Sequence, residues 1–162
     1  MRGALFVLLG VVSLCSGAII GCVVQPDRFY QVCFTSEEDI SNFKREIENL
    51  AHTSGLKFID DSEAVTAQNK RLANRLPSMP FQTPATSVGV RGRNVWFLTA
   101  VSFNDAWWQV HIALFSFGSE KSRAERFANE AVQKLGAVWK LHPVPQDKGA
   151  FPLPECLEPK RT

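Results

Sequence analysis

The first half of the chain alternates between strand and helix patterns. Residues 29–34 are rich in aromatic and β-branched side chains, which favours a strand. Thr35 and Glu38 have the spacing of a capping box, which predicts that Thr35 is the N-cap of a helix. Apolar residues then recur every three or four positions on one helical stripe, namely Ile40, Phe43, Ile47, Leu50 and Ala51. The helix ends near Gly55, and residues 56–60 return as a short strand.

The second half repeats this order. Residues 107–117 predict a long strand, and Ser119 or Ser122 can cap the helix that follows. One clean apolar stripe defines this helix: Ala124, Phe127, Ala128, Ala131, Val132 and Leu135. Gly136 is expected to end it, and residues 137–142 to form a strand.

Between these two units, residues 61–76 have weak helical spacing, and prolines then interrupt regular structure up to residue 84. Residues 87–103 predict extended chain, interrupted near 91–94, which pairs as a hairpin with the strand that starts at Trp107. The tail after His142 is rich in proline and is expected to be extended.

Two right-handed β-α-β units with a hairpin between them predict an α+β domain. We expect a variant of the ferredoxin-like sandwich, with two helices on one face of a mixed, mostly antiparallel sheet of about four to five strands. The domain would span residues 29–142, with an insert at 61–87 and a Pro-rich tail at 143–162.

Strict alternation divides the hairpin into two faces. The face expected under the helices carries Val95, Phe97, Thr99, Val101 and Phe103, with Trp108, Val110, Ile112 and Leu114 on the partner strand. The other face carries Trp96, Leu98, Ala100 and Ser102, with Trp107, Gln109, His111, Ala113 and Phe115 on the partner strand. This second face is too aromatic for a surface that meets only water.

Three explanations for the aromatic face remain open. The insert or the tail covers it as a second small core, or it binds a protein or a second copy of the chain. In the third explanation it takes a glycan fragment or a lipid beside Gln109 and His111. The candidate binding residues are Trp96, Trp107, Gln109, His111 and Phe115.

Net charge and residue spacing argue against several classes of function. A formal charge of +2 over 162 residues lacks the basic footprint of a nucleic-acid-binding protein, so we expect no nucleic-acid partner. The three histidines, His52, His111 and His142, have no metal-ligand spacing, and no phosphate loop or nucleophile elbow is present. We therefore assign no catalytic residue, metal or cofactor, and expect a protein that is not an enzyme.

Two charged groups have a second interpretation. Asp60, Asp61 and Glu63 form either a solvated turn with a helix cap or a site for a cation or for acid–base chemistry. Five basic residues precede the proline-rich linker: Lys44, Arg45, Lys70, Arg71 and Arg75. They form either a solvated helix face or a contact with an anionic membrane or an acidic partner.

The N-terminal segment predicts an export signal. Residues 3–24 contain no charged side chain and follow Arg2, and the run closes with Ile19-Ile20-Gly21-Cys22. This tetrapeptide resembles the lipobox of bacterial lipoproteins. The resemblance implies that residues 1–21 are a signal peptide, that Cys22 becomes an acylated N-terminus, and that residues 22–28 link it to the domain. An uncleaved N-terminal anchor, or secretion with cleavage after Ala18, are the alternatives.

The same resemblance implies a location and a cysteine pairing. Val23, rather than aspartate, follows Cys22, which favours an outer-membrane anchor that faces the periplasm. Cys15 leaves with the signal and Cys22 takes the lipid, so Cys33 and Cys156 remain in a compartment where disulfides persist. We expect these two to pair, the alternative being two buried thiols.

These inferences lead to one functional hypothesis. The chain is a lipid-anchored protein of the cell envelope, with a small, non-catalytic domain that binds another envelope protein. The alternatives are a small envelope enzyme, a glycan- or lipid-binding module that uses the aromatic face, and a purely structural component of the envelope.

Overall fold

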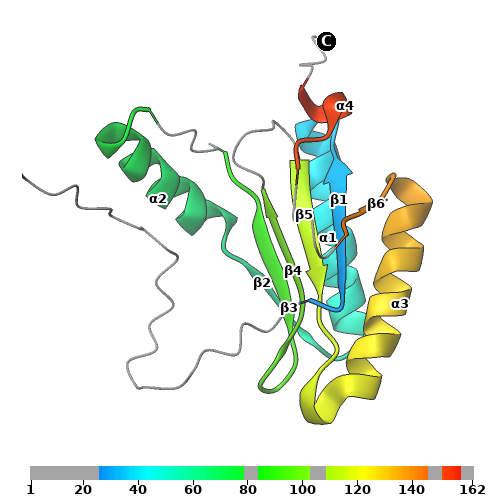
Figure 1. Cartoon of the computed structure of the whole chain (residues 1–162). Helices are drawn as coiled ribbons and strands as arrows, with labels where there is room; N and C mark the ends of the chain where they lie inside the picture. The colour runs from blue at the N-terminus through cyan, green and yellow to red at the C-terminus, as the bar shows by residue number, and fades with distance from the viewer. Residues whose placement is uncertain (1–25, 79–83, 103–108, 146–150, 158–162) are drawn as a thin grey trace, which may run out of the picture.

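A computed structural model describes residues 26–78, 84–102, 109–145 and 151–157, which form an α+β domain (Figure 1). The elements in chain order are β1 (Arg28–Cys33), α1 (Glu37–Thr53), β2 (Lys57–Asp60), α2 (Ser62–Arg75), β3 (Ser87–Arg91), β4 (Trp96–Ser102), β5 (Gln109–Leu114), α3 (Lys121–Val138), β6 (His142–Pro143) and α4 (Pro154–Leu157). The lipobox residues and Cys15 lie outside the described residues.

The described strands form one six-stranded sheet in the order β2-β3-β4-β5-β1-β6. Every neighbouring pair is antiparallel, whereas a mixed sheet of four to five strands was expected. The reason is that the two strands of each β-α-β unit are never neighbours. Strands β3, β4 and β5 separate β1 from β2, and β1 separates β5 from β6.

Helices α1 and α3 cover one face of the sheet, and the main core lies between them and the strands (Figure 1). The predicted stripe of α1 supplies Phe43, Ile47, Leu50 and Ala51, all buried. In α3 the buried residues are Ala124, Phe127, Ala128, Ala131 and Leu135, with Val132 partly buried against the same core. Phe127 meets Phe97 of β4 with the ring centroids 6.0 Å apart. Hydrophobic periodicity therefore predicted the packed face of both helices.

Helix α1 begins one residue later than the capping-box pattern predicted. Ser36, not Thr35, is the N-cap, and its Oγ accepts from the backbone N–H of Asp39 at 3.1 Å. The Asp39 carboxylate in turn accepts from the backbone N–H and the hydroxyl of Thr35, at 3.0 and 2.6 Å. The Thr35 hydroxyl is the main cause that holds the pKa of Asp39 below its usual value. Ser36 and Asp39 thus form the reciprocal hydrogen bonds of the cap, one residue further along than Thr35 and Glu38.

Helix α3 differs from the prediction at both ends. It follows a 3₁₀ turn at Gly118–Glu120, and its N-cap is Glu120, so neither Ser119 nor Ser122 caps it. At the other end the helix continues through Gly136, and its C-cap is Trp139. The Trp139 ring packs edge-on against Phe34 and Phe43, with centroids 5.9 and 5.6 Å away. This packing explains why residues 137 and 138 stay helical and why β6 is limited to His142–Pro143.

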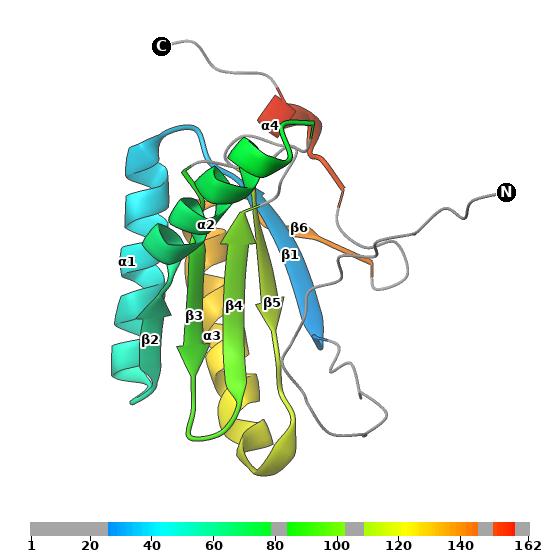
Figure 2. The same cartoon turned by 90° about the vertical axis from the view of Figure 1, so that its left-hand side faces the viewer.

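Helix α2 confirms the weak helical pattern of the insert. It lies on the side of the sheet opposite α1 and α3, as the two views in Figures 1 and 2 show. Ser62 is the buried residue of this helix, and its hydroxyl accepts from the backbone N–H of Ser87 at 2.9 Å. Thr66 accepts from the N–H of Ala85 at 2.9 Å. Side-chain hydrogen bonds at its start thus attach α2 to the chain that leads into β3.

Candidate binding surface on the outer face of the sheet

A β-bulge in β4 decides which side chains reach each face of the sheet. Val90 of β3 pairs with Leu98, whereas the next residue, Arg91, pairs with Trp96. Phe97 is therefore an extra residue on β4, and it and Leu98 are both fully buried. A bulge of this kind interrupts the alternation, so each residue beyond it changes face relative to a strictly alternating strand.

The bulge overturns part of the predicted division of faces. Leu98 and Ala100 are fully buried and pair with Leu114 and Ile112 of the core, so they do not belong to the second face. Ser102 pairs with Val110 and is likewise on the core side. Three predicted core residues of β5 are confirmed: Val110, Ile112 and Leu114. Val95 packs against the core as a partly buried residue, and Phe97 is in the core as predicted.

Thr99 and Val101, predicted for the core, lie instead on the face away from α1 and α3, which we call the outer face. Their pairing partners there are Ala113 and His111. Val101 is 44% exposed. Strand β1 adds residues whose partners in β5 share this face: Phe29, Gln31 and Cys33.

Trp96, Gln109, His111 and Ala113 lie on the outer face as predicted. Phe115 is half-buried beyond β5, with its ring 6.1 Å from that of Phe117. Three aromatic residues of the predicted faces lie outside the described residues: Phe103, Trp107 and Trp108.

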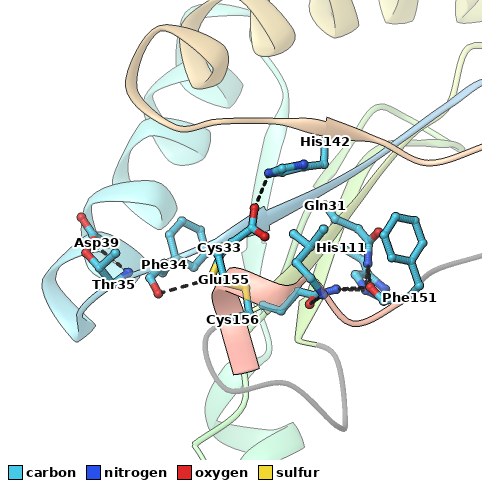
Figure 3. Close-up of a disulfide and its surroundings, with 12 residues drawn as sticks. Gln31, Cys33, Phe34, Thr35, Asp39, His111, His142, Phe151, Glu155 and Cys156 are labelled. Atoms are coloured by element: carbon cyan, nitrogen blue, oxygen red, sulfur yellow. Dashed lines mark hydrogen bonds and ion pairs between the residues drawn. A yellow bond between two sulfur atoms is a disulfide. The ribbon is translucent and has the colours of Figure 1, made fainter. Parts of the chain in front are cut away.

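Residues 151–157, which we call the strap, cover the half of the outer face formed by β5 and β1 (Figure 3). The amide nitrogens of Gln31 and Gln109 both donate to the backbone carbonyl of Phe151, the latter at 2.8 Å. The N–H of Leu153 donates to Oε1 of Gln109 at 2.8 Å. Both glutamines are fully buried. Gln109 is therefore part of the structure that holds the strap, and it is not open to a ligand.

His111 lies between the two glutamines. Its Nε2 is 3.1 Å from the amide nitrogen of Gln31 and 3.3 Å from that of Gln109. Because amide nitrogens donate, Nε2 acts as the acceptor, which places the ring proton on Nδ1. Burial lowers the pKa of His111 to about 4. The imidazole is therefore neutral at pH 7, with its Nε2 engaged by the two amides.

A disulfide between Cys33 and Cys156 fastens the strap to β1, as the sequence predicted, across a separation of 123 residues (Figure 3). Leu153 and Cys156 are buried beside Cys33 as a small second core. His142 of β6 adds a polar contact, with its Nε2 2.8 Å from Oε1 of Glu155. The tail thus covers this half of the outer face, as the first of the three explanations for the aromatic face proposed.

The other half of the outer face, formed by β2, β3 and β4, is crossed at one end by α2 and is uncovered elsewhere among the described residues (Figure 2). We call the uncovered part the open patch. It consists of Trp96 and Val101, which are 37% and 44% exposed, with the half-buried Ile59 of β2 and Thr99 of β4. The Trp96 indole lies over Gly89 of β3. A Cβ atom at Gly89 would come within 2.5 Å of Cζ3 of Trp96, so the close approach requires glycine.

Three residues of the outer face were not predicted from the sequence. Arg91 places its guanidinium carbon 5.7 Å from the centroid of the Trp96 ring, a cation–π contact. Val101 was assigned to the core because the sequence of β4 fits strict alternation and does not indicate the bulge at Phe97. Gln31 was also missed, although it is the polar residue between Phe29 and Cys33 on an otherwise apolar face of β1.

The acidic group at the end of β2 has a structural role. The Asp60 carboxylate accepts from Lys44 Nζ at 3.1 Å and from the Ser62 N–H at 2.9 Å, where α2 begins. Burial raises the pKa of Asp60, but the hydrogen bonds from Ser62 and Lys44 outweigh it and lower the net value. Asp61 is the N-cap residue of α2, without a side-chain cap hydrogen bond. Within the described ranges, no three His, Cys, Asp or Glu residues are placed to hold a metal ion.

Comparison of the chain with protein-family models, curated proteins and solved structures found no match. Among the helices that the structure describes, none has the length and apolar character to cross a membrane. The function proposed below therefore rests on the residues of the domain and on the lipobox resemblance.

Proposed function

We propose that this chain is a non-catalytic protein of the cell envelope, anchored by lipid on Cys22, whose domain binds another envelope protein through the open patch. The anchor and its outer-membrane, periplasm-facing location follow from the resemblance of Ile19-Ile20-Gly21-Cys22 to a lipobox. The observation that carries the binding function is the exposure of Trp96 and Val101 on a sheet face whose other half is sealed.

The composition of the open patch supports a protein partner. Trp and Arg are the residues most enriched among binding hot spots, and here Arg91 lies against Trp96. The patch is also held in place before binding. Trp96 rests on the backbone of Gly89, and the strap beside it is fixed by the Cys33–Cys156 disulfide. A rigid surface loses little conformational entropy when it binds.

The two alternative functions, a glycan- or lipid-binding module and a small enzyme, would use residues under the strap rather than the open patch. A glycan- or lipid-binding module was expected to use Gln109 and His111, but Gln109 is fully buried and hydrogen-bonded to Phe151 and Leu153. An enzyme that used His111 as a base would have to free Nε2 from two amide donors. These contacts favour the protein-binding function.

We also propose that the fold is an elaborated ferredoxin-like sandwich. If α2, β3 and β4 are set aside, the chain reads β1-α1-β2-β5-α3-β6. This is the β-α-β-β-α-β order of the ferredoxin-like plan. The additional hairpin β3–β4 then widens the sheet and supplies Gly89, Arg91, Trp96 and Val101, so the proposed binding function lies on the elaboration.

Site-specific photo-crosslinking tests the binding function. A photoreactive amino acid replaces Val101 of the full-length chain, in the cells that produce it, and replaces the exposed Asn129 of α3 in a matched control. We expect a protein adduct from position 101 and none of the same mass from position 129. The proposal is wrong if position 101 gives no adduct, or if both positions give the same one.

A further inference from the structure

The side of the domain that carries the open patch is basic. The described strand positions on the outer face include two exposed cations, Lys57 and Arg91, and no carboxylate. Lys57 and Arg91 are direct partners across β2 and β3, so the two positive charges are adjacent. From this arrangement we infer that the partner presents an acidic segment with apolar side chains to the open patch, an inference that rests on the proposed binding function.

Helix α2 extends the positive charge along the same side (Figure 2). It carries three exposed basic residues, Lys70, Arg71 and Arg75, against one acidic residue, Glu63. Helix α1, on the opposite side of the sheet, has the reverse balance, and its first turn alone holds Glu37, Glu38 and Asp39. Helix α3, beside α1, carries Lys121, Arg123, Arg126 and Lys134 against Glu125 and Glu130, so the reverse balance holds for α1 and not for that whole side.

The basic residues on the outer side are not neutralised within the described part of the domain. Six ion pairs occur there, and none involves Lys57, Arg91 or a residue of α2. Of the five basic residues that precede the proline-rich linker, Lys44 instead pairs with Asp60, on the side of α1. Glu155 of the strap pairs with His142, and Glu120, beside the β3–β4 turn, pairs with Arg123 at 3.1 Å. Unpaired charges of one sign steer a partner of the opposite sign.

The pose of Trp96 favours a protein segment over a membrane surface. The indole lies against Gly89 instead of projecting from the sheet, so it cannot reach into a bilayer as an interfacial anchor does. A ring that lies along the sheet offers its flat face to the apolar side chains of a partner. Arg91 lies beside the Trp96 ring, and its planar guanidinium can donate two parallel hydrogen bonds to a carboxylate.

Charge reversal in the crosslinking experiment tests this inference. The crosslinker stays at position 101 of the full-length chain, and Lys57→Glu and Arg91→Glu are introduced together. The matched control is Arg126→Glu, an exposed arginine of α3 on the other side of the sheet. We expect the double variant to lower the adduct yield at least about tenfold and the control to leave it unchanged. Arg91→Lys, which keeps the charge, should retain most of the adduct.

A purified probe identifies the chemistry. The full-length chain in neutral detergent is titrated with a peptide that alternates glutamate and leucine, then with the same peptide carrying lysine for glutamate, and then with anionic phosphatidylglycerol vesicles. We expect the acidic peptide alone to shift the Trp96 indole resonance, and the shift to weaken with added salt.

The outcomes separate the two proposals. If the chain without charge reversal gives no adduct at position 101, the binding function itself is wrong. If an adduct forms and survives the double reversal at an unchanged urea midpoint, the partner is not acidic and only this inference is wrong. Binding of the lysine peptide, or of vesicles in preference to the acidic peptide, would likewise overturn it.

Discussion

Gln109 and Leu153 are 44 residues apart in the sequence, yet the backbone N–H of Leu153 donates to Oε1 of Gln109 at 2.8 Å. The amide nitrogen of the same side chain donates to the Phe151 carbonyl. One buried glutamine thus binds the donor of one strap residue and the acceptor of another. Together with the disulfide, this contact makes the strap part of the domain and leaves the open patch as the accessible part of the outer face.

Replacement of Gln109 should weaken the whole domain. Gln109→Leu leaves the buried Leu153 N–H without its acceptor and removes one of the two amide donors to the Phe151 carbonyl. An unsatisfied buried polar group costs about 1–3 kcal/mol, so we expect a loss of that size in the free energy of unfolding, measured by urea denaturation. Gln68→Leu, at an exposed position of α2, should change it by less than about 0.5 kcal/mol. Equal effects of both substitutions would contradict this account of Gln109.

The disulfide should contribute strongly to stability. Because Cys33 and Cys156 are 123 residues apart, their bond restricts a long stretch of the unfolded chain. Removal of such a bond costs about 2–5 kcal/mol, so reductant should lower the urea midpoint clearly. The Cys33→Ser, Cys156→Ser double variant should start at the lower midpoint and not respond to reductant. A reductant-dependent midpoint in that variant would assign the effect to other cysteines.

The stability of the domain should fall between about pH 6.5 and pH 4 because of His111. Its pKa is about 4 in the folded state, against 6.5 for an unperturbed histidine, so the unfolded chain takes up the proton first. The stabilisation from His111 is therefore complete above pH 6.5 and is lost as the pH falls through this window. Urea midpoints measured across the window should show the slope in the unsubstituted chain and a weaker slope in His111→Gln. If both chains have the same slope, His111 is not its source.

Gly89 should control the position of the Trp96 indole. In Gly89→Ala the new Cβ would lie 2.5 Å from Cζ3 of Trp96, so the ring must move off the sheet. The cost of moving the ring opposes the gain from replacing a strand glycine, so we expect the free energy of unfolding to change by less than about 1 kcal/mol.

The readout for Gly89 is the fluorine resonance of 5-fluorotryptophan at position 96, assigned with Trp96→Phe. We expect it to shift in Gly89→Ala. Gly136→Ala in α3 is the control, because its Cβ would meet only Leu141, at 3.7 Å, and the resonance should stay in place. An unchanged resonance in Gly89→Ala would mean that the indole does not rest on Gly89.

The lipid anchor is tested by the intact mass of the membrane-extracted protein. We expect a chain that begins at an acylated Cys22 and that gains about 2 Da on reduction, from the Cys33–Cys156 bond. Sequencing of the N-terminal peptide locates the modification. A chain that retains Met1 would instead indicate an uncleaved anchor, and an unmodified chain that starts after Ala18 would indicate ordinary secretion.

The sequence predicted the elements better than their ends. The apolar stripes of α1 and α3 are periodic over more than three turns, so local pattern alone defined their buried faces. The ends depended on particular contacts: Ser36 and Asp39 share the cap bonds of α1, and the packing of Trp139 keeps α3 helical past Gly136. The disulfide was predictable because the lipobox resemblance accounted for Cys15 and Cys22 and left one pair.

Local periodicity was enough to predict the α+β class and the packing faces of both long helices, and the lipobox resemblance added the pairing of Cys33 with Cys156. Which part of the outer face is open depends instead on contacts between segments that are distant in the sequence. The extra residue Phe97 turned Leu98 and Ala100 inward and Val101 outward, and the strap buried Gln109. A bulge depends on how two strands pair, and the strap depends on a contact between distant segments. Neither can therefore be predicted from the residue pattern of a single strand.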